Sequence, residues 1–174
     1  AALFVTLSSF IGTESEGIGG AVALVGCKAV MEGSTFIGCR ASSGGGAVGA
    51  GPFACYGQNL KRNTSAVIQN CSFLACEADG HGGALYVESS RSIATISSTN
   101  FTTCHSNTSG GAVAVENGAT VSVSNINFIG NRAGDGGGGL SVLASSVAMV
   151  SNTTFLMNEA LGIGGGAIYT GQSS

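Results

Sequence analysis

Charged residues are scarce in this chain. Of its 174 residues only nine are Asp or Glu and six are Lys or Arg, which gives a formal net charge of −3. A protein that binds nucleic acid needs a basic surface to neutralise phosphates, so we expect no nucleic-acid partner. Disordered chains are rich in charge and poor in apolar residues, whereas 44% of this chain is hydrophobic. The composition therefore favours a folded protein.

Long apolar runs are also missing. No segment approaches the ~18 consecutive apolar residues of a membrane-spanning helix, so no membrane insertion is expected. The first residues, 1–7, lack the basic segment that opens a signal peptide and are interpreted as part of the mature chain. The length fits one domain, residues 1–174.

Glycine and cysteine are the residues that the chain has in unusual supply. The 30 glycines have no collagen period, and six cysteines favour an oxidising compartment. Five Asn-x-Ser/Thr sequons are candidate N-glycosylation sites, which predicts N-linked glycans and an extracellular or cell-surface location. The alternative is that these asparagines serve as turn and ladder residues. The sequons begin at Asn63, Asn70, Asn100, Asn107 and Asn152.

One motif recurs six times along the chain. Each copy has a Phe, a short polar segment, and then Gly-Gly followed by a small and an aliphatic residue. The Phe residues are Phe10, Phe36, Phe73, Phe101, Phe128 and Phe155, with spacings of 26, 37, 28, 27 and 27. The second glycines are assigned to Gly20, Gly46, Gly83, Gly111, Gly139 and Gly166. Because the Phe residues and the second glycines recur with nearly the same spacing, the sequence indicates a repeat architecture.

The repeat predicts an all-β fold, a right-handed single-stranded parallel β-helix of about six coils with about 27 residues per coil. Segments such as 113–115 and 121–123 alternate in steps of two, as strands do, and we expect three short strands per coil. Stacked strands lie about 4.8 Å apart, so equivalent side chains form continuous columns. The long 37-residue step predicts a surface loop inserted at about 49–63.

Two apolar columns are predicted besides the Phe column. The first lies two residues after each second Gly, at Val22, Val48, Leu85, Val113, Ser141 and Ile168. The second lies five residues before each Phe, at Val5, Met31, Ile68, Ile96, Val123 and Val150.

The pattern resembles the GGA[ILV] and F-x-x-N repeats of the polymorphic outer-membrane proteins of chlamydiae and of similar pectate-lyase-like β-helices. Segments 128–131 and 155–158 keep the Asn of this motif, whereas Cys39, Cys76 and Cys104 take its place in three earlier coils and Thr13 in the first. The resemblance covers nearly the whole chain. It implies a right-handed parallel β-helix and, in that family, a surface or adhesive role.

The cysteines fall at related positions of neighbouring coils. Stacked residues have the Cα separation that a disulfide needs, which predicts the pairs Cys27–Cys55 and Cys39–Cys76. Cys71 and Cys104 stay unassigned. A zinc site is not expected, because no C-x₂-C with a matching partner occurs.

A column of charged residues lies four residues after each Phe. Its members mostly alternate in sign and are interpreted as a solvated charge ladder: Glu14, Arg40, Glu77, His105, Arg132 and Glu159. The alternative is a metal or substrate site built from Glu77, Asp79, His81 and His105. These four supply too few carboxylates for a Ca²⁺ cage.

Motifs of catalysis and cofactor binding are absent from the sequence. No G-x-S-x-G occurs, and the glycine run 136–139 lacks the Lys of a phosphate-binding loop. We therefore expect neither enzymatic activity nor a cofactor.

The two ends of the chain are in phase with the repeat. A step from Phe155 through Ser174 to a following Phe10 would span 29 residues. We expect either a window from a longer β-helix or copies that stack head to tail, since contacts that do not close give fibres.

The sequence thus predicts a structural role, a rigid glycosylated extracellular rod. One alternative is an adhesin with a binding patch at Pro52, Phe53 and Tyr56. Another is a polysaccharide-active enzyme of the pectate-lyase-like type.

Overall fold

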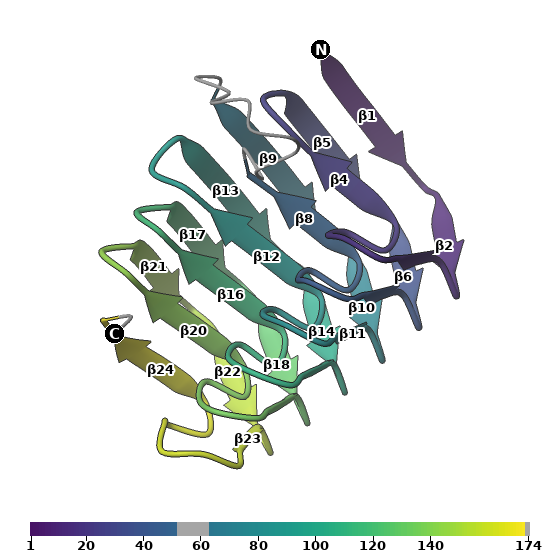
Figure 1. Cartoon of the computed structure of the whole chain (residues 1–174). Helices are drawn as coiled ribbons and strands as arrows, with labels where there is room; N and C mark the ends of the chain where they lie inside the picture. Colours follow the sequence, from purple (N-terminus) through teal and green to yellow (C-terminus); the bar gives the residue numbers. More distant parts are fainter. Residues whose placement is uncertain (52–62, 173–174) are drawn as a thin grey trace.

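The fold is an all-β solenoid. The computed structural model describes residues 1–51 and 63–172, which form strands and turns. Each coil contributes four strands, and six coils stack along one axis (Figure 1). Equivalent strands of successive coils pair in parallel, which confirms the predicted fold class. Within the described residues there is no helix of the length and hydropathy needed to cross a membrane.

Four sheets of six strands run along the axis, and each takes one strand from every coil. Sheet 1 contains β1 (Ala2–Thr6), β5 (Lys28–Glu32), β9 (Thr64–Gln69), β13 (Ser92–Ser97), β17 (Thr120–Ser124) and β21 (Val147–Ser151). Sheet 2 contains β2 (Ser9–Ile11), β6 (Thr35–Ile37), β10 (Ser72–Leu74), β14 (Asn100–Thr102), β18 (Asn127–Ile129) and β22 (Thr154–Leu156). Sheet 3 contains β3 (Glu14–Ser15), β7 (Arg40–Ala41), β11 (Glu77–Ala78), β15 (His105–Ser106), β19 (Arg132–Ala133) and β23 (Glu159–Ala160). Sheet 4 contains β4 (Val22–Leu24), β8 (Val48–Ala50), β12 (Leu85–Glu88), β16 (Val113–Glu116), β20 (Leu140–Leu143) and β24 (Ile168–Gly171).

The core is built from columns of in-register side chains. The six Phe rings of sheet 2 stack face to face, with neighbouring centroids 4.7 to 5.1 Å apart. The column that runs from Val5 to Val150 in sheet 1 is also in register. Both columns agree with the prediction from the repeat. Burial of such apolar area contributes about 25 cal/mol per Å² to folding.

Two of the corners between sheets have a left-handed residue in every coil. At the corner between sheets 1 and 2, the residues with positive φ are Leu7, Gly33, Asn70, Ser98, Asn125 and Asn152. At the corner between sheets 2 and 3, they are Gly12, Gly38, Ala75, Thr103, Gly130 and Met157. A single residue in the αL region turns the chain sharply, and Gly and Asn tolerate this conformation best. The αL conformation at these two corners therefore explains why Gly or Asn occurs there in most coils.

Two details of the predicted repeat are wrong. Each coil has four strands instead of three, because a two-residue strand of sheet 3 separates sheets 2 and 4. In coil five, Leu140 rather than Ser141 pairs with Val113 and Ile168, so Gly138 rather than Gly139 occupies the second-glycine position.

The predicted insertion falls between β8 and β9. Gly49 and Ala50 belong to strand β8, and β9 begins at Thr64. Residues 52–62, including Pro52, Phe53, Cys55 and Tyr56, lie outside the described residues.

Candidate functional site

The outer face of sheet 4 is covered by the chain that connects sheet 3 to sheet 4. Isolated parallel bridges link Ile18 to Gly44 and Gly44 to His81, so these connections stack like the strands. A Cβ at Gly44 would lie 2.8 Å from the Tyr86 ring. Glycine in the connection therefore lets the backbone close over a large outward side chain. Tyr86 is buried as a result.

A buried carboxylate lies at the edge of this covered face. Glu116, at the end of β16, is only 9% exposed. Its Oε1 lies 2.9 Å from Nδ1 of His81, which comes from the connection of the preceding coil. The Tyr86 hydroxyl donates a hydrogen bond to the other carboxylate oxygen at 3.2 Å. Two neighbouring coils are thus joined by an imidazole–carboxylate–phenol cluster.

The charges of the cluster change the protonation of its members. The close contact with the Glu116 carboxylate raises the pKa of His81, with further help from the Asp135 and Glu88 charges, while burial acts in the opposite direction. Burial, together with the Glu116 and Glu88 carboxylates, raises the pKa of Tyr86. The cluster therefore favours the imidazolium form of His81, and Tyr86 stays a neutral donor.

A groove of about 300 Å³ adjoins this cluster. Its volume is at the small end of the range for ligand pockets, roughly 300 to 1,000 Å³. An imidazole that is oriented by a neighbouring carboxylate can act as a general acid or base. The groove is lined by His81, Ser109, Asp135, Leu143, Ile163, Tyr169 and Gln172.

The His81–Glu116 pair predicts a pH-dependent stability. The folded-state pKa of His81 is raised, so the pair contributes fully below the unfolded value of about 6.5. Its contribution disappears as the pH rises through the folded-state pKa. We expect the melting temperature of His81→Gln to approach that of the parent chain as the pH increases. Thermal unfolding by circular dichroism between acidic and alkaline pH measures this convergence.

The matched control is His105→Gln, because His105 is the second of the two histidines and its ring forms a hydrogen bond with the exposed Asn107 amide, at 3.1 Å. This variant should keep the pH dependence of the parent chain. If His105→Gln removes the dependence and His81→Gln does not, the assignment to the buried pair is wrong.

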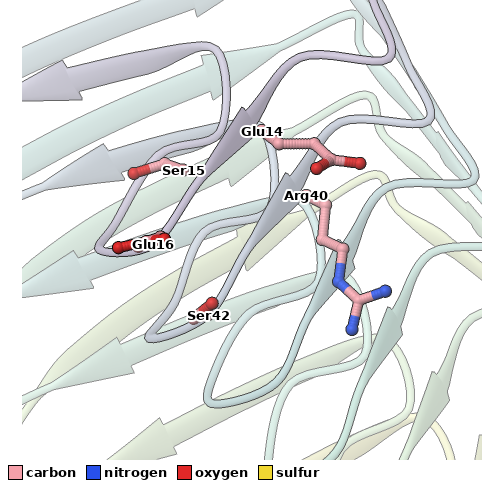
Figure 2. Close-up of a pocket in the computed structure, with 5 residues that line it drawn as sticks. All are labelled: Glu14, Ser15, Glu16, Arg40 and Ser42. Carbon is pink, nitrogen blue, oxygen red and sulfur yellow. The ribbon is translucent and has the colours of Figure 1, made fainter.

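The predicted charge ladder forms one register column of sheet 3. Arg132 forms an ion pair with its ladder neighbour Glu159, at 3.3 Å. Arg40 instead pairs with Asp79, with Nη2 and Oδ1 2.9 Å apart. The first two rungs line a shallow cleft of about 170 Å³ in which Glu14 and Arg40 lie side by side (Figure 2). Exposed pairs of this kind contribute about 0–1 kcal/mol each.

The four residues of the alternative metal site have different partners. Asp79 pairs with Arg40, His81 with Glu116 and His105 with Asn107. Nowhere in residues 1–51 and 63–172 do three or more His, Cys, Asp or Glu side chains gather as metal ligands would.

The predicted Cys39–Cys76 disulfide is wrong for this structure, in which both cysteines are free thiols. Each of the two thiols lies within hydrogen-bonding distance of the Phe carbonyl of the preceding coil, Cys39 at Phe10 O and Cys76 at Phe36 O. Cys27, Cys71 and Cys104 are free as well. The predicted Cys27–Cys55 pair involves Cys55, which lies outside the described residues.

The cysteines have another role, which the sequence pattern did not reveal. The Cys39, Cys76 and Cys104 thiols each donate toward the carbonyl of the Phe in the preceding coil, at 3.6, 3.6 and 3.8 Å. The carbonyl two residues earlier in the same coil shares each proton, at 3.8, 3.6 and 3.5 Å. In the last two coils the Asn131 and Asn158 amides make the same bond to the Phe carbonyl, at 3.0 and 2.8 Å. Cys and Asn are therefore alternative donors in an F-x-x-[CN] motif that joins successive coils.

The donor role requires a protonated thiol. The hydrogen bond with Cys104, in which the Cys76 thiol is the donor, together with burial raises the pKa of Cys76 to about 12. Thiolates are the nucleophilic and metal-binding form of cysteine. Cys76 is therefore unreactive at neutral pH.

Asn131 is the most highly connected member of this column. It is fully buried, its Oδ1 accepts from the Cys104 amide at 2.9 Å, and its Nδ2 donates to Phe101 O and Asn158 Oδ1. Asn131→Leu leaves a buried N–H and a buried carbonyl without partners, which should cost roughly 2–4 kcal/mol. Urea denaturation measures this loss. Asn131→Cys keeps the donor used in the earlier coils and should lose clearly less; equal losses would contradict the donor role.

All five sequon asparagines are exposed. Asn70 and Asn152 are αL corner residues, as is Asn125, which is not in a sequon. Asn152 also donates to the Asn125 amide oxygen. Asn100 accepts from Asn127 at 2.8 Å. Each of the five asparagine side chains is therefore accessible to solvent. At Asn70 and Asn152 the αL conformation of the corner explains the choice of Asn without any glycan.

Comparison of the chain with known protein families, with curated proteins and with solved structures gives no match.

Proposed function

We propose that this chain is a structural element, a rigid glycosylated extracellular rod. The observation that carries the proposal is the unbroken stack of six Phe rings, which runs with the four sheets through every coil. Each coil is fixed to the next by backbone ladders and by the F-x-x-[CN] bonds. A solenoid with such nearest-neighbour coupling resists bending along its whole length.

The exposed sequons and the low surface charge support an extracellular site of action. Glycans on exposed asparagines provide solubility for a chain with few charges. Expression in a eukaryotic secretory host, followed by mass spectrometry before and after peptide-N-glycosidase treatment, tests this part. We expect a mass decrease after treatment, and single Asn→Gln variants identify the occupied sequons. A secreted chain whose mass does not change would contradict the glycosylation proposal.

The rod itself is tested by electron microscopy of the purified glycoprotein. Coils stacked at about 4.8 Å predict an axial length of roughly 29 Å for six coils. Thin particles of this axial length, or of multiples of it, support the proposal, and particles of a different length and shape would contradict it.

A second candidate function is an adhesin module, and the F-x-x-[CN] bonds favour it. The resemblance to the chlamydial outer-membrane repeats was incomplete because Cys replaces Asn at Cys39, Cys76 and Cys104. Cys and Asn both donate to the carbonyl of the Phe in the preceding coil. The two residues are therefore equivalent at this position, and the resemblance to the F-x-x-N repeat includes the coils that carry Cys. Binding of the fluorescently labelled rod to host cells would favour the adhesin over a purely structural role.

The enzyme alternative is tested at the groove beside His81 and Glu116. Turnover of uronic-acid polymers that is lost in a His81→Gln/Glu116→Gln variant would replace the structural proposal. Arg132→Gln, at an exposed ladder position, is the control for a general effect of lost charge.

A further inference from the structure

Side chains on the outer face of sheet 4 change in size along the rod. One register column of this face contains, in order, Tyr86, Ala114, Ser141 and Tyr169. The connection of coil four lies directly on the first small residue, because a Cβ at Gly110 would be 2.9 Å from the Ala114 Cβ. The surface is therefore low between the two tyrosines, and the groove of about 300 Å³ lies there.

The groove is a feature of the side of the rod. Four of its lining residues belong to the interior coils three to five, namely His81, Ser109, Asp135 and Leu143. The first three come from the connections between sheets 3 and 4, and Leu143 ends strand β20. The chemistry of the groove is therefore set by side chains of consecutive interior coils.

Ser109 has a hydroxyl group without a partner at this groove. Its backbone is fixed by a bridge to Gly136 and by the Gly82 amide, which donates to the Ser109 carbonyl at 3.0 Å. The residue is only 4% exposed, yet it lines the groove. Among the residues that the structure describes, none forms a hydrogen bond with its side chain. Because a nearly buried hydroxyl without a partner is unfavourable, the Ser109 hydroxyl is available to a polar group that enters the groove.

Negative charge is in excess at the groove. Asp135 is exposed, and it forms no ion pair within residues 1–51 and 63–172. Of the lining residues only His81 can carry a positive charge, and it already faces Glu116 at 2.9 Å. The Asp135 and Glu88 charges both act on His81. The field at the groove therefore favours a cationic ligand over an anionic one.

The groove also has apolar walls. Leu143 is half-buried there. The Tyr169 ring lies against the backbone of coil five, since a Cβ at Gly136 would be 2.6 Å from it. The face of an aromatic ring attracts a cation, and an aliphatic chain that ends in a charge packs on apolar surface while its charged end stays polar. The walls therefore suit a cation that is carried on an alkyl chain.

We propose that this groove binds an alkylammonium group, the chemistry of a lysine side chain on a partner protein. The ammonium pairs with the Asp135 carboxylate and donates a hydrogen bond to Ser109 Oγ. Its methylene groups pack against Leu143 and the Tyr169 ring. The site goes beyond the structural role proposed above and does not depend on it.

The experiment is an NMR titration of the ¹⁵N-labelled 174-residue chain with Nα-acetyl-lysine amide. The chain is produced without glycans, so that no glycan on Asn107, two residues before Ser109, can occupy the groove. We expect the amide signals of Ser109 and Asp135 to shift, with a Kd of about 1 mM, as for a weak single-group ligand. The absence of shifts at the groove up to about 0.1 M, far above that Kd, overturns the proposal.

Two further probes test which chemistry is recognised. Nα-acetyl-norleucine amide keeps the alkyl chain and lacks the ammonium, and it should bind clearly more weakly than the lysine probe. Glucosamine carries an ammonium on a polar ring and should also bind more weakly, because the apolar walls gain nothing from it. Equal binding of the norleucine probe overturns the role of the charge. Tighter binding of glucosamine overturns the lysine assignment.

Variants of the two polar groups test the site itself. Asp135→Asn should weaken binding of the lysine probe about tenfold, and Ser109→Ala about fivefold, the effects of hydrogen bonds to a charged and a neutral group. Both variants should melt like the parent chain, because neither side chain has a partner to lose. The matched control is Glu77→Gln, which removes an exposed carboxylate outside the groove and should bind like the parent chain. If Asp135→Asn binds like the parent, or Glu77→Gln weakens binding as much, the assignment to this groove is wrong.

Discussion

Phe101→Ala is expected to lower the free energy of unfolding by about 3–5 kcal/mol, the range for a large-to-small change in a packed core. The Phe101 ring is fully buried. It stacks on Phe73 at 4.8 Å and on Phe128 at 5.1 Å, so its removal opens a cavity in the centre of the column. The backbone ladders on both sides keep the neighbouring coils from closing that cavity. Guanidinium denaturation followed by circular dichroism measures the loss.

Phe10→Ala is the matched control at the end of the same column. Phe10 is only partly buried and has a single ring neighbour, Phe36, at 4.9 Å. Its truncation should cost clearly less than that of Phe101, because a solenoid is stabilised by contacts between adjacent coils. Equal losses at the two positions would contradict a continuous core.

The repeat made most of the fold predictable. A solenoid brings residues one period apart into register, so the spacing of Phe10, Phe36 and their successors was enough to define the columns. Sheet 3 was missed for a physical reason. A strand of two residues, such as Glu14–Ser15, is too short to show the alternation that identifies strands in a sequence.

The register error in coil five has an equally local cause. The run of four glycines at 136–139 offers two choices for the Gly-Gly landmark, and glycines carry no side-chain pattern that would separate them. Only the pairing of Leu140 with Val113 resolves the choice.

The candidate site was less predictable than the fold. His81 was recognised as a titratable residue, but its partner was not, because the contact depends on how the connection before β12 folds over sheet 4. No spacing rule links His81 to Glu116. The cysteines were recognised as stacked, which suggested disulfides, whereas the acceptor of each thiol is a backbone carbonyl that the sequence does not display.

Gly83→Ala is expected to have the largest effect of all, a loss of more than about 4 kcal/mol, which is exceptional for a single substitution. A Cβ at Gly83 would lie 2.1 Å from the Gly111 carbonyl oxygen and 2.4 Å from that of His105. Both atoms belong to the backbone of the next coil, which cannot move without breaking its own ladder. We therefore expect the variant to fold poorly and to melt far below the parent chain in thermal scans.

The contrast is Gly38→Ala, which adds the same methyl group where nothing lies within 4 Å. Gly38 has a φ of 57°, and Ala75 already occupies the same corner position of the next coil with a φ of 50°. The cost should be only the αL penalty of about 1–2 kcal/mol. If Gly83→Ala lowers the stability as little as Gly38→Ala does, this contradicts the close approach of successive coils at the glycine pair. If the two differ as expected, the Gly-Gly landmark of the sequence is a steric requirement of coil stacking.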